Sequence, residues 1–253
     1  MSPPRKIAVV PIYNESKHIG QVLATFSARM DVTIAVNDGS TDNCSQILAS
    51  WIAGQPSCYV VDNPENRGKA SALKDGFALA SQLMDEGLLS PDDLLYTFDA
   101  DGQHTVDAIE QLGERMVSHN LDMLLTRRDF RHYPRFKKVG NWGLSTIASV
   151  LGGYKYDDVE CGFRVLRLGR VAEILSYYTG YKYSSEQELG IIAARWGLLN
   201  FDSVAACPSH WPFFTQKSFE VIAPKLATIV RNGAKGRASL STRSPLSTVT
   251  AAK

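Results

Sequence analysis

Short apolar segments alternate with amphipathic helical patterns through the first half of the chain, and this alternation limits the folds it can adopt. The apolar segments occupy residues 6–12, 32–36, 58–61, 94–98 and 121–125. Between them, apolar residues recur at i, i+3, i+4 and i+7, as in Ile19, Val22, Leu23 and Phe26. Such alternation is typical of a mainly parallel central sheet flanked by helices. We therefore predict an α/β fold.

The second half of the chain is less regular. Helical patterns occupy residues 139–151, 171–175 and 184–196, and residues 198–207 resemble a last strand. From about Gly233 the chain is rich in Ser, Thr, Ala, Lys and Arg, which is typical of a disordered tail. With no linker and no internal repeat, we predict one domain over residues 1–232 and a disordered tail over residues 233–253.

Composition excludes several classes of protein. A formal net charge of +1 does not indicate a nucleic-acid-binding protein. The four cysteines include no CxxC pair, which argues against a zinc site or a disulfide scaffold and fits the reducing cytoplasm. No run reaches the roughly 18 apolar residues that a membrane span needs, and the N-terminus lacks the apolar stretch of a signal peptide. We expect a cytoplasmic protein that contacts a membrane only peripherally.

Polar and acidic residues follow the apolar segments. Tyr13 and Glu15 follow the first segment, Asp38 follows the second, and Asp99 and Asp101 follow the fourth. In a mainly parallel sheet these positions meet at one edge, where such folds bind their ligands. Carboxylates are hard oxygen ligands that suit Mg²⁺ or Mn²⁺ bridging a diphosphate, although Asp and Gly are also common in ordinary turns.

Five motifs, in this order, resemble those of family 2 glycosyltransferases, which have the Rossmann-like GT-A fold of nucleotide-diphospho-sugar transferases. They are Val10–Glu15, Asn37–Asp42, Asn66–Lys69, Asp99–His104 and Asp158–Arg164. The last two are most similar to those of dolichyl- and polyprenyl-phosphate mannose or glucose synthases. The G-x-G-x-x-G turn of dehydrogenases and the Walker A loop are absent. The resemblance implies a metal-dependent, inverting transfer of a sugar from a UDP- or GDP-sugar.

The resemblance also implies roles for individual residues. Those expected to bind the nucleotide-sugar are Pro11, Tyr13, Glu15, Asp38, Lys69, Asp99 and Ala100. The expected ligands of Mg²⁺ or Mn²⁺ are Asp99, Asp101 and Gln103, with ribose binding as an alternative role for Asp99. The metal would neutralise the leaving nucleoside diphosphate. We expect His104 to support these ligands rather than bind the ion, and His210 is a weaker candidate for the metal or diphosphate.

The identity of the acceptor depends on the second half of the chain. We assign residues 1–126 to the nucleotide-sugar and residues 127–232 to the acceptor. A phosphate acceptor is already a nucleophile and needs cations, whereas a hydroxyl acceptor needs a carboxylate base. The candidate cations are Arg127, Arg131 and Arg135, in a basic run that could also be a solvated loop. The candidate bases are Asp157, Asp158 and Glu160. Catalytic roles are expected for Asp101, Asp158 and Arg164.

Polyprenyl or dolichyl phosphate is the preferred acceptor, reached from the inner membrane face. The alternative is a soluble glycosyltransferase that acts on a small hydroxyl acceptor in natural-product or polysaccharide synthesis. A nucleotidyltransferase that makes the sugar nucleotide is a remote alternative, because its Gly-rich loop after the first strand is missing. No nucleic-acid partner is expected, and the sequence leaves the oligomeric state open.

Overall fold

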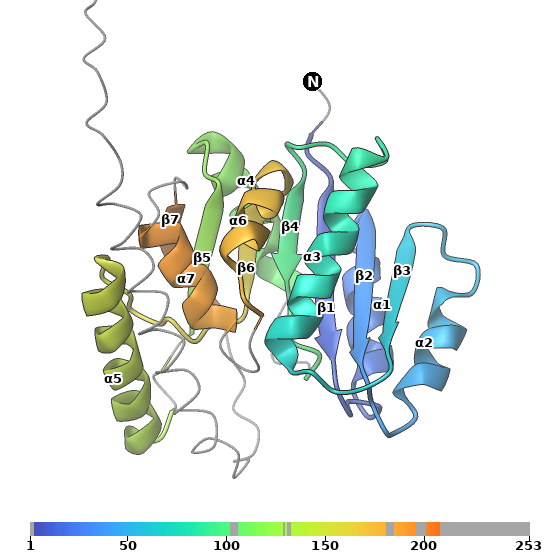
Figure 1. Cartoon of the computed structure of the whole chain (residues 1–253), viewed down its shortest axis with the longest axis horizontal. Helices are drawn as coiled ribbons and strands as arrows, with labels where there is room; N and C mark the ends of the chain where they lie inside the picture. Colours follow the sequence, from blue (N-terminus) through green and yellow to red (C-terminus); the bar gives the residue numbers. More distant parts are fainter. Residues whose placement is uncertain are drawn as a thin grey trace, which may run out of the picture.

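The computed structural model describes residues 3–101, 106–128, 130, 133–180, 185–195 and 201–207. Strands within these ranges form one sheet (Figure 1). They are β1 Lys6–Ile12, β2 Val32–Asp38, β3 Cys58–Asn63, β4 Leu94–Thr97, β5 Met123–Arg128, β6 Arg164–Arg167 and β7 Phe201–Cys207. The sheet is seven-stranded, in the order β3-β2-β1-β4-β6-β5-β7.

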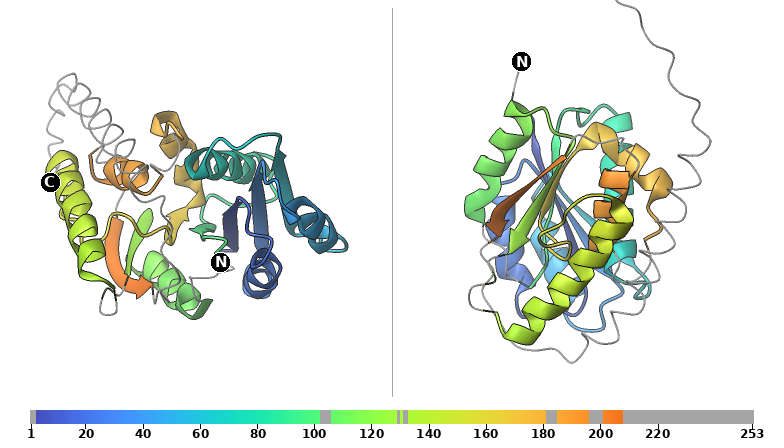
Figure 2. Two further views of the ribbon diagram at one scale, coloured as in Figure 1. Left: turned by 90° about the horizontal axis from the view of Figure 1, so that it is seen from below. Right: turned by 90° about the vertical axis from the view of Figure 1, so that its left-hand side faces the viewer.

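Helices cover both faces of the sheet, as the end-on views of Figure 2 show. They are α1 Ile19–Ser27, α2 Cys44–Ile52, α3 Lys69–Asp85, α4 Ile109–Ser118, α5 Arg135–Gly152, α6 Val171–Tyr177 and α7 Ser185–Arg195, with 3₁₀ turns η1 Val106–Ala108 and η2 Leu168–Arg170. No helix among the described residues is long and apolar enough to cross a membrane.

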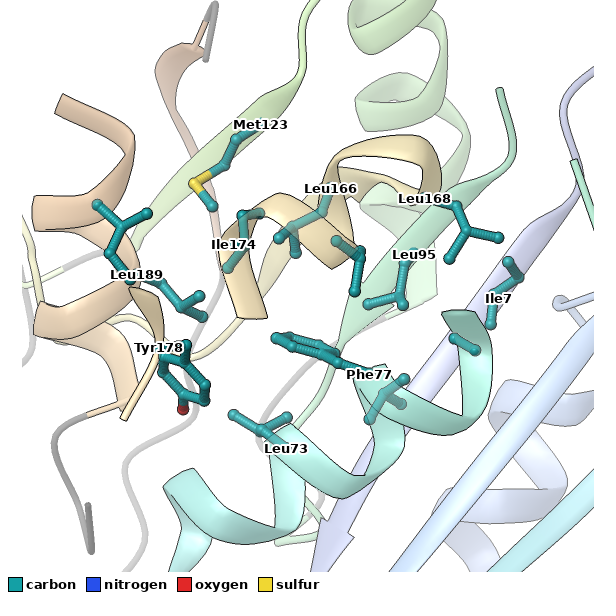
Figure 3. Packing of buried hydrophobic residues seen from close by; sticks show 14 of the residues in the cluster. Ile7, Leu73, Phe77, Leu95, Met123, Leu166, Leu168, Ile174, Tyr178 and Leu189 are labelled. Atoms are coloured by element: carbon teal, nitrogen blue, oxygen red, sulfur yellow. The ribbon is translucent and has the colours of Figure 1, made fainter. Parts of the chain in front are cut away.

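Two apolar clusters hold the layers together because strand side chains alternate between the faces. On one face, Phe77 of α3 packs with Leu95 of β4 and with Tyr178 beyond α6 (Figure 3). On the other face, Phe26 of α1 stacks on Phe98 after β4, with ring centroids 4.0 Å apart. Both clusters draw on helical positions that the apolar periodicity predicts.

The sheet is mainly parallel, which confirms the predicted fold class. Strands β1, β2, β3 and β4 run parallel as neighbours, and so do β5 and β7. Strand β6 is inserted antiparallel between β4 and β5. Its first residue, Arg164, pairs with Thr97 at the end of β4, so the motif preceding β6 lies at the carboxyl edge of the parallel strands.

Two boundaries differ from the sequence prediction. Strand β5 continues to Arg128 instead of ending at residue 125, because its last residues pair with β7 and Arg128 has a buried partner. Helix α5 begins at Arg135 instead of residue 139, directly after Pro134, whose fixed φ suits a helix start. The predicted tail over residues 233–253 lies outside the described residues, and the division into two functional halves stays a prediction.

Candidate nucleotide-sugar site

The loops after β1 and β2 are bound to each other at the lower edge of the sheet in Figure 1. The backbone N–H of Asn14 donates to Ser40 Oγ at 3.0 Å, and the N–H of Thr41 donates to Asn14 Oδ1 at 2.8 Å. The N–H of Ser16 donates to Asp42 Oδ2 at 3.0 Å. The first two motifs therefore form one connected wall, which carries Tyr13 and Glu15.

Asp38, the last residue of β2, fixes the turn that leads into α3. Its side chain is buried, and its two oxygens accept hydrogen bonds from the N–H groups of Arg67 at 3.1 Å and Gly68 at 2.7 Å. Gly68 has φ +95°, a conformation that glycine adopts without strain. Asp38 thus places Lys69 as the first residue of α3, facing the end of β4.

Lys69 connects three elements of the site. Its ammonium pairs with Asp99 after β4 and with Glu186 of α7, the latter at 2.6 Å. Burial alone would lower the pKa of Lys69, but these two carboxylates outweigh it and hold the pKa above its ordinary value. The sequence predicts Glu186 only as part of a helix start. Its burial beside a Lys is a signal that appears only when the chain is folded.

Carboxylates from separate motifs meet at this edge. Burial raises the pKa of Glu15, and the neighbouring charges of Asp101, Asp42 and Asp99 raise it further. This group of carboxylates therefore favours the binding of a proton by Glu15 or of a cation between the side chains. Of the remaining predicted nucleotide-sugar residues, Pro11 and Ala100 are buried and Tyr13 is half-buried.

The acidic edge suits a hard divalent cation that shares a nucleotide diphosphate. Within the described ranges, no three His, Cys, Asp or Glu side chains are arranged to bind one ion. Mg²⁺ commonly uses one or two carboxylates together with substrate phosphates, so Asp99 and Asp101 fit that donor set. The third predicted ligand, Gln103, lies outside the described residues, as do His104 and His210.

The loop before β6 is held from both sides. Buried Arg164 donates from Nε to the carbonyl oxygen of Cys161 at 3.2 Å and from Nη2 to that of Val159 at 2.9 Å. Thr97 Oγ1 donates to the carbonyl oxygen of Gly162 at 2.6 Å. These contacts fix the Cys-Gly-Phe-Arg segment beside Asp99. Arg164 thus binds the loop that carries it.

A second buried ion pair anchors the same loop. Arg128 binds both oxygens of Asp158, from Nε at 2.8 Å and from Nη2 at 2.8 Å, and the Asp158 side chain is 0% exposed. By contrast, the neighbouring pair between Arg127 and Asp157 is exposed, at 2.9 Å. Arg135 is exposed at the start of α5, and Arg131 lies outside the described residues.

Gly162 faces the ion pair of Lys69 and Asp99. A Cβ at this position would lie 2.8 Å from Asp99 Oδ2 and 2.9 Å from Lys69 Nζ. The backbone would accept alanine, since Gly162 is not among the glycines with positive φ. A side chain at this position would therefore displace Asp99 or Lys69, and this close approach links two motifs that are distant in sequence.

Substituting Gly162 by Ala should displace Asp99 while preserving the fold. The obstructing atoms are the ends of flexible side chains, so we expect a loss of unfolding free energy below about 1 kcal/mol. Turnover should fall about 10- to 100-fold because Asp99 is misplaced. Gly20→Ala is the control, since its Cβ would meet nothing closer than Ile47 at 3.8 Å. Equal initial rates for the two variants would contradict the assigned role of Gly162.

Two solved structures that share this fold contain UDP or a UDP-sugar. Glucosyl-3-phosphoglycerate synthase from Mycobacterium tuberculosis, in complex with Mn²⁺, UDP and glucosyl-3-phosphoglycerate, has a TM-score of 0.64 and 16% identity, covering 91% of this chain and 80% of that chain. TarS from S. aureus, in complex with UDP-GlcNAc, has a TM-score of 0.62 and 15% identity, covering 92% and 66%. At this identity the likeness establishes the fold alone, which is GT-A.

The family follows from sequence. A family model described as "Glycosyl transferase family 2" matches residues 7–171, and the chain belongs to this family of glycosyltransferases. A Methanococcus voltae protein named UDP-N-acetylglucosamine–dolichyl-phosphate N-acetylglucosaminyltransferase is 30% identical over 205 residues, 74% of this chain and 79% of that protein. The dolichyl-phosphate β-glucosyltransferase of Saccharomyces cerevisiae is 24% identical over 214 residues, 74% and 62%. The predicted likeness to the polyprenyl-phosphate type is confirmed.

Proposed function

We propose that this protein is a metal-dependent, inverting glycosyltransferase that transfers a sugar from a nucleotide-diphospho-sugar to polyprenyl or dolichyl phosphate. The observation that supports this most is the meeting of Glu15, Lys69 and Asp99, from three separate motifs, at one sheet edge. The names of the relatives and the UDP bound in the structural neighbours favour a UDP-sugar over a GDP-sugar.

The donor is bound by the first two loops and the start of α3. Pro11, Tyr13 and Glu15 line the pocket for base and ribose, and Asp38 holds the turn that presents Lys69. Asp99 and Asp101 would hold Mg²⁺ or Mn²⁺, which when bound supplies neutralisation of the leaving diphosphate. Lys69 keeps Asp99 oriented and adds positive charge near that diphosphate.

The state of Asp158 removes one of the three candidate bases that a hydroxyl acceptor would need. A hydroxyl acceptor needs a carboxylate that can take its proton. Asp158, one of the predicted bases, is buried with both oxygens bound by Arg128, so it is poorly suited to this role. A phosphate monoester attacks the anomeric carbon without a base, and Arg127, Arg131 and Arg135 are the cations we assign to it. Asp158 and Arg164 then position the loop beside the reaction.

An acceptor assay tests the proposed function. Purified protein is incubated with a labelled UDP-sugar, Mn²⁺, and either polyprenyl phosphate or a panel of soluble hydroxyl acceptors, with EDTA as the control. We expect a product that organic solvent extracts, formed with polyprenyl phosphate in Mn²⁺ and lost in EDTA. Product formed only with the hydroxyl acceptors would contradict the proposed acceptor. It would favour the alternative, a soluble glycosyltransferase that acts on a small hydroxyl acceptor.

A further inference from the structure

Two carboxylates share the ammonium of Lys69, and they differ in exposure. The side chain of Asp99 is 28% exposed, whereas that of Glu186, in the first turn of α7, is 8% exposed. Among the described residues, these are the carboxylates that pair with Lys69. Asp99 is therefore the partner on the solvent side of the ammonium, and Glu186 is the partner on the buried side.

The position of Lys69 explains why its ammonium needs carboxylate partners. Lys69 is the first residue of α3, where the positive end of the helix dipole disfavours a cation. Its side chain is also largely withdrawn from solvent, and a poorly hydrated ammonium is costly unless it is paired. Because one ammonium lies between two carboxylates, the group as a whole keeps a negative charge. Asp99 is therefore not fully neutralised and can still attract a cation.

Contacts with other segments hold Glu186 in place. Helix α7 touches both α3 and α5 (Figure 1). One turn after Glu186, the carbonyl oxygen of Gly190 accepts a hydrogen bond from the Tyr156 hydroxyl at 2.7 Å. In the same first turn of α7, Glu188 accepts a hydrogen bond from the N–H of Thr179 at 2.7 Å. The carboxylate of Glu186 is therefore presented to Lys69 by an anchored helix start.

The metal assigned to Asp99 competes with Lys69 for the same carboxylate. When Asp99 coordinates Mg²⁺ or Mn²⁺, the positive charge of the ion repels the nearby ammonium and weakens the pair between Asp99 and Lys69. The loop beside the pair leaves the ammonium little room, since a Cβ at Gly162 would lie 2.9 Å from Lys69 Nζ. An ammonium that lost its carboxylate there would be destabilised. A second carboxylate that stays bound to Lys69 removes this cost.

We propose that Glu186 is a positioning residue that retains Lys69 when Asp99 binds the metal, so that Lys69 does not compete with the ion. Glu186 acts through Lys69 and contacts neither the metal nor the sugar. It lies in the half of the chain predicted to bind the acceptor, so the metal on the donor side depends on both halves. The inference rests on the proposed function, because it requires a divalent cation at Asp99.

Binding of Mn²⁺ in the presence of saturating UDP tests this role without any turnover. Electron paramagnetic resonance of the free ion measures the affinity for Mn²⁺. We expect the variant E186Q to bind Mn²⁺ at least about tenfold more weakly than the wild type, because Lys69 then neutralises Asp99. E188Q is the matched control, since it removes the same charge from the same turn of α7 and should bind Mn²⁺ as the wild type does. Thermal unfolding verifies that each variant is folded, and E186A replaces E186Q if that variant does not fold.

A double-variant cycle separates this role from a direct effect of the charge of Glu186 on the ion. In the variant K69M the competing ammonium is gone, so adding E186Q should leave the affinity for Mn²⁺ unchanged. An equal loss of affinity with and without Lys69 would overturn the proposal, and so would wild-type affinity in folded E186Q. Failure of the wild type to bind Mn²⁺ with UDP would instead contradict the proposed function.

Discussion

Asp101→Asn should lower the rate of sugar transfer about a thousandfold, which corresponds to ~4 kcal/mol of transition-state stabilisation. The substitution keeps the shape of the side chain but removes the negative charge that we assign to the metal-diphosphate complex. Initial rates with a UDP-sugar and Mn²⁺ measure the effect, and thermal unfolding verifies that the fold is retained.

Asp107→Asn is the matched control for this prediction. Asp107 lies after Asp101 in the same connection between β4 and α4. It is exposed on η1 and is assigned no role in binding. Its rate should equal that of the wild type. If Asp101→Asn also retained the wild-type rate, the assignment of the Asp-Ala-Asp motif to metal and diphosphate would be wrong.

Asp158→Ala should destabilise the protein by about 3–5 kcal/mol, the usual cost of removing one partner of a buried ion pair. It leaves the guanidinium of Arg128 without a carboxylate beside the loop, with two side-chain hydrogen bonds of 2.8 Å lost. Urea unfolding measures the change in free energy. The adjacent Asp157→Ala breaks an exposed pair with Arg127 and should cost about 0–1 kcal/mol.

A double variant separates the buried ion pair from simple loss of packing. Arg128→Met with Asp158→Leu removes both charges and keeps apolar volume, so it should recover much of the stability that Asp158→Ala loses. Equal small losses for Asp157→Ala and Asp158→Ala would show that the buried pair does not anchor the loop before β6.

The first half of the fold could be predicted because its signals are local. Buried parallel strands are apolar runs, and each helix between them shows its own periodicity, so β1, β2 and β4 and the loops after them follow from the sequence. The antiparallel insertion of β6 could not be predicted in this way. Its direction depends on pairing with β4 and β5, which the pattern of a four-residue strand does not encode.

Contacts between distant residues explain what sequence reasoning missed in the site. Lys69 was expected near the nucleotide, but its partner Glu186 lies on a helix that the periodicity assigns only to the core. Likewise, the space that Gly162 leaves for Asp99 exists only once two motifs have met.

Calorimetric titration of UDP into the wild-type protein, in Mn²⁺ and in EDTA, tests the central claim most directly, because it needs neither the sugar nor the acceptor to be known. The account predicts that UDP binds at least about tenfold more tightly in Mn²⁺ than in EDTA, and that Asp101→Asn removes this difference while Asp107→Asn retains it. Equal affinity for UDP in Mn²⁺ and in EDTA would contradict a metal-dependent nucleotide-sugar site at this edge of the sheet.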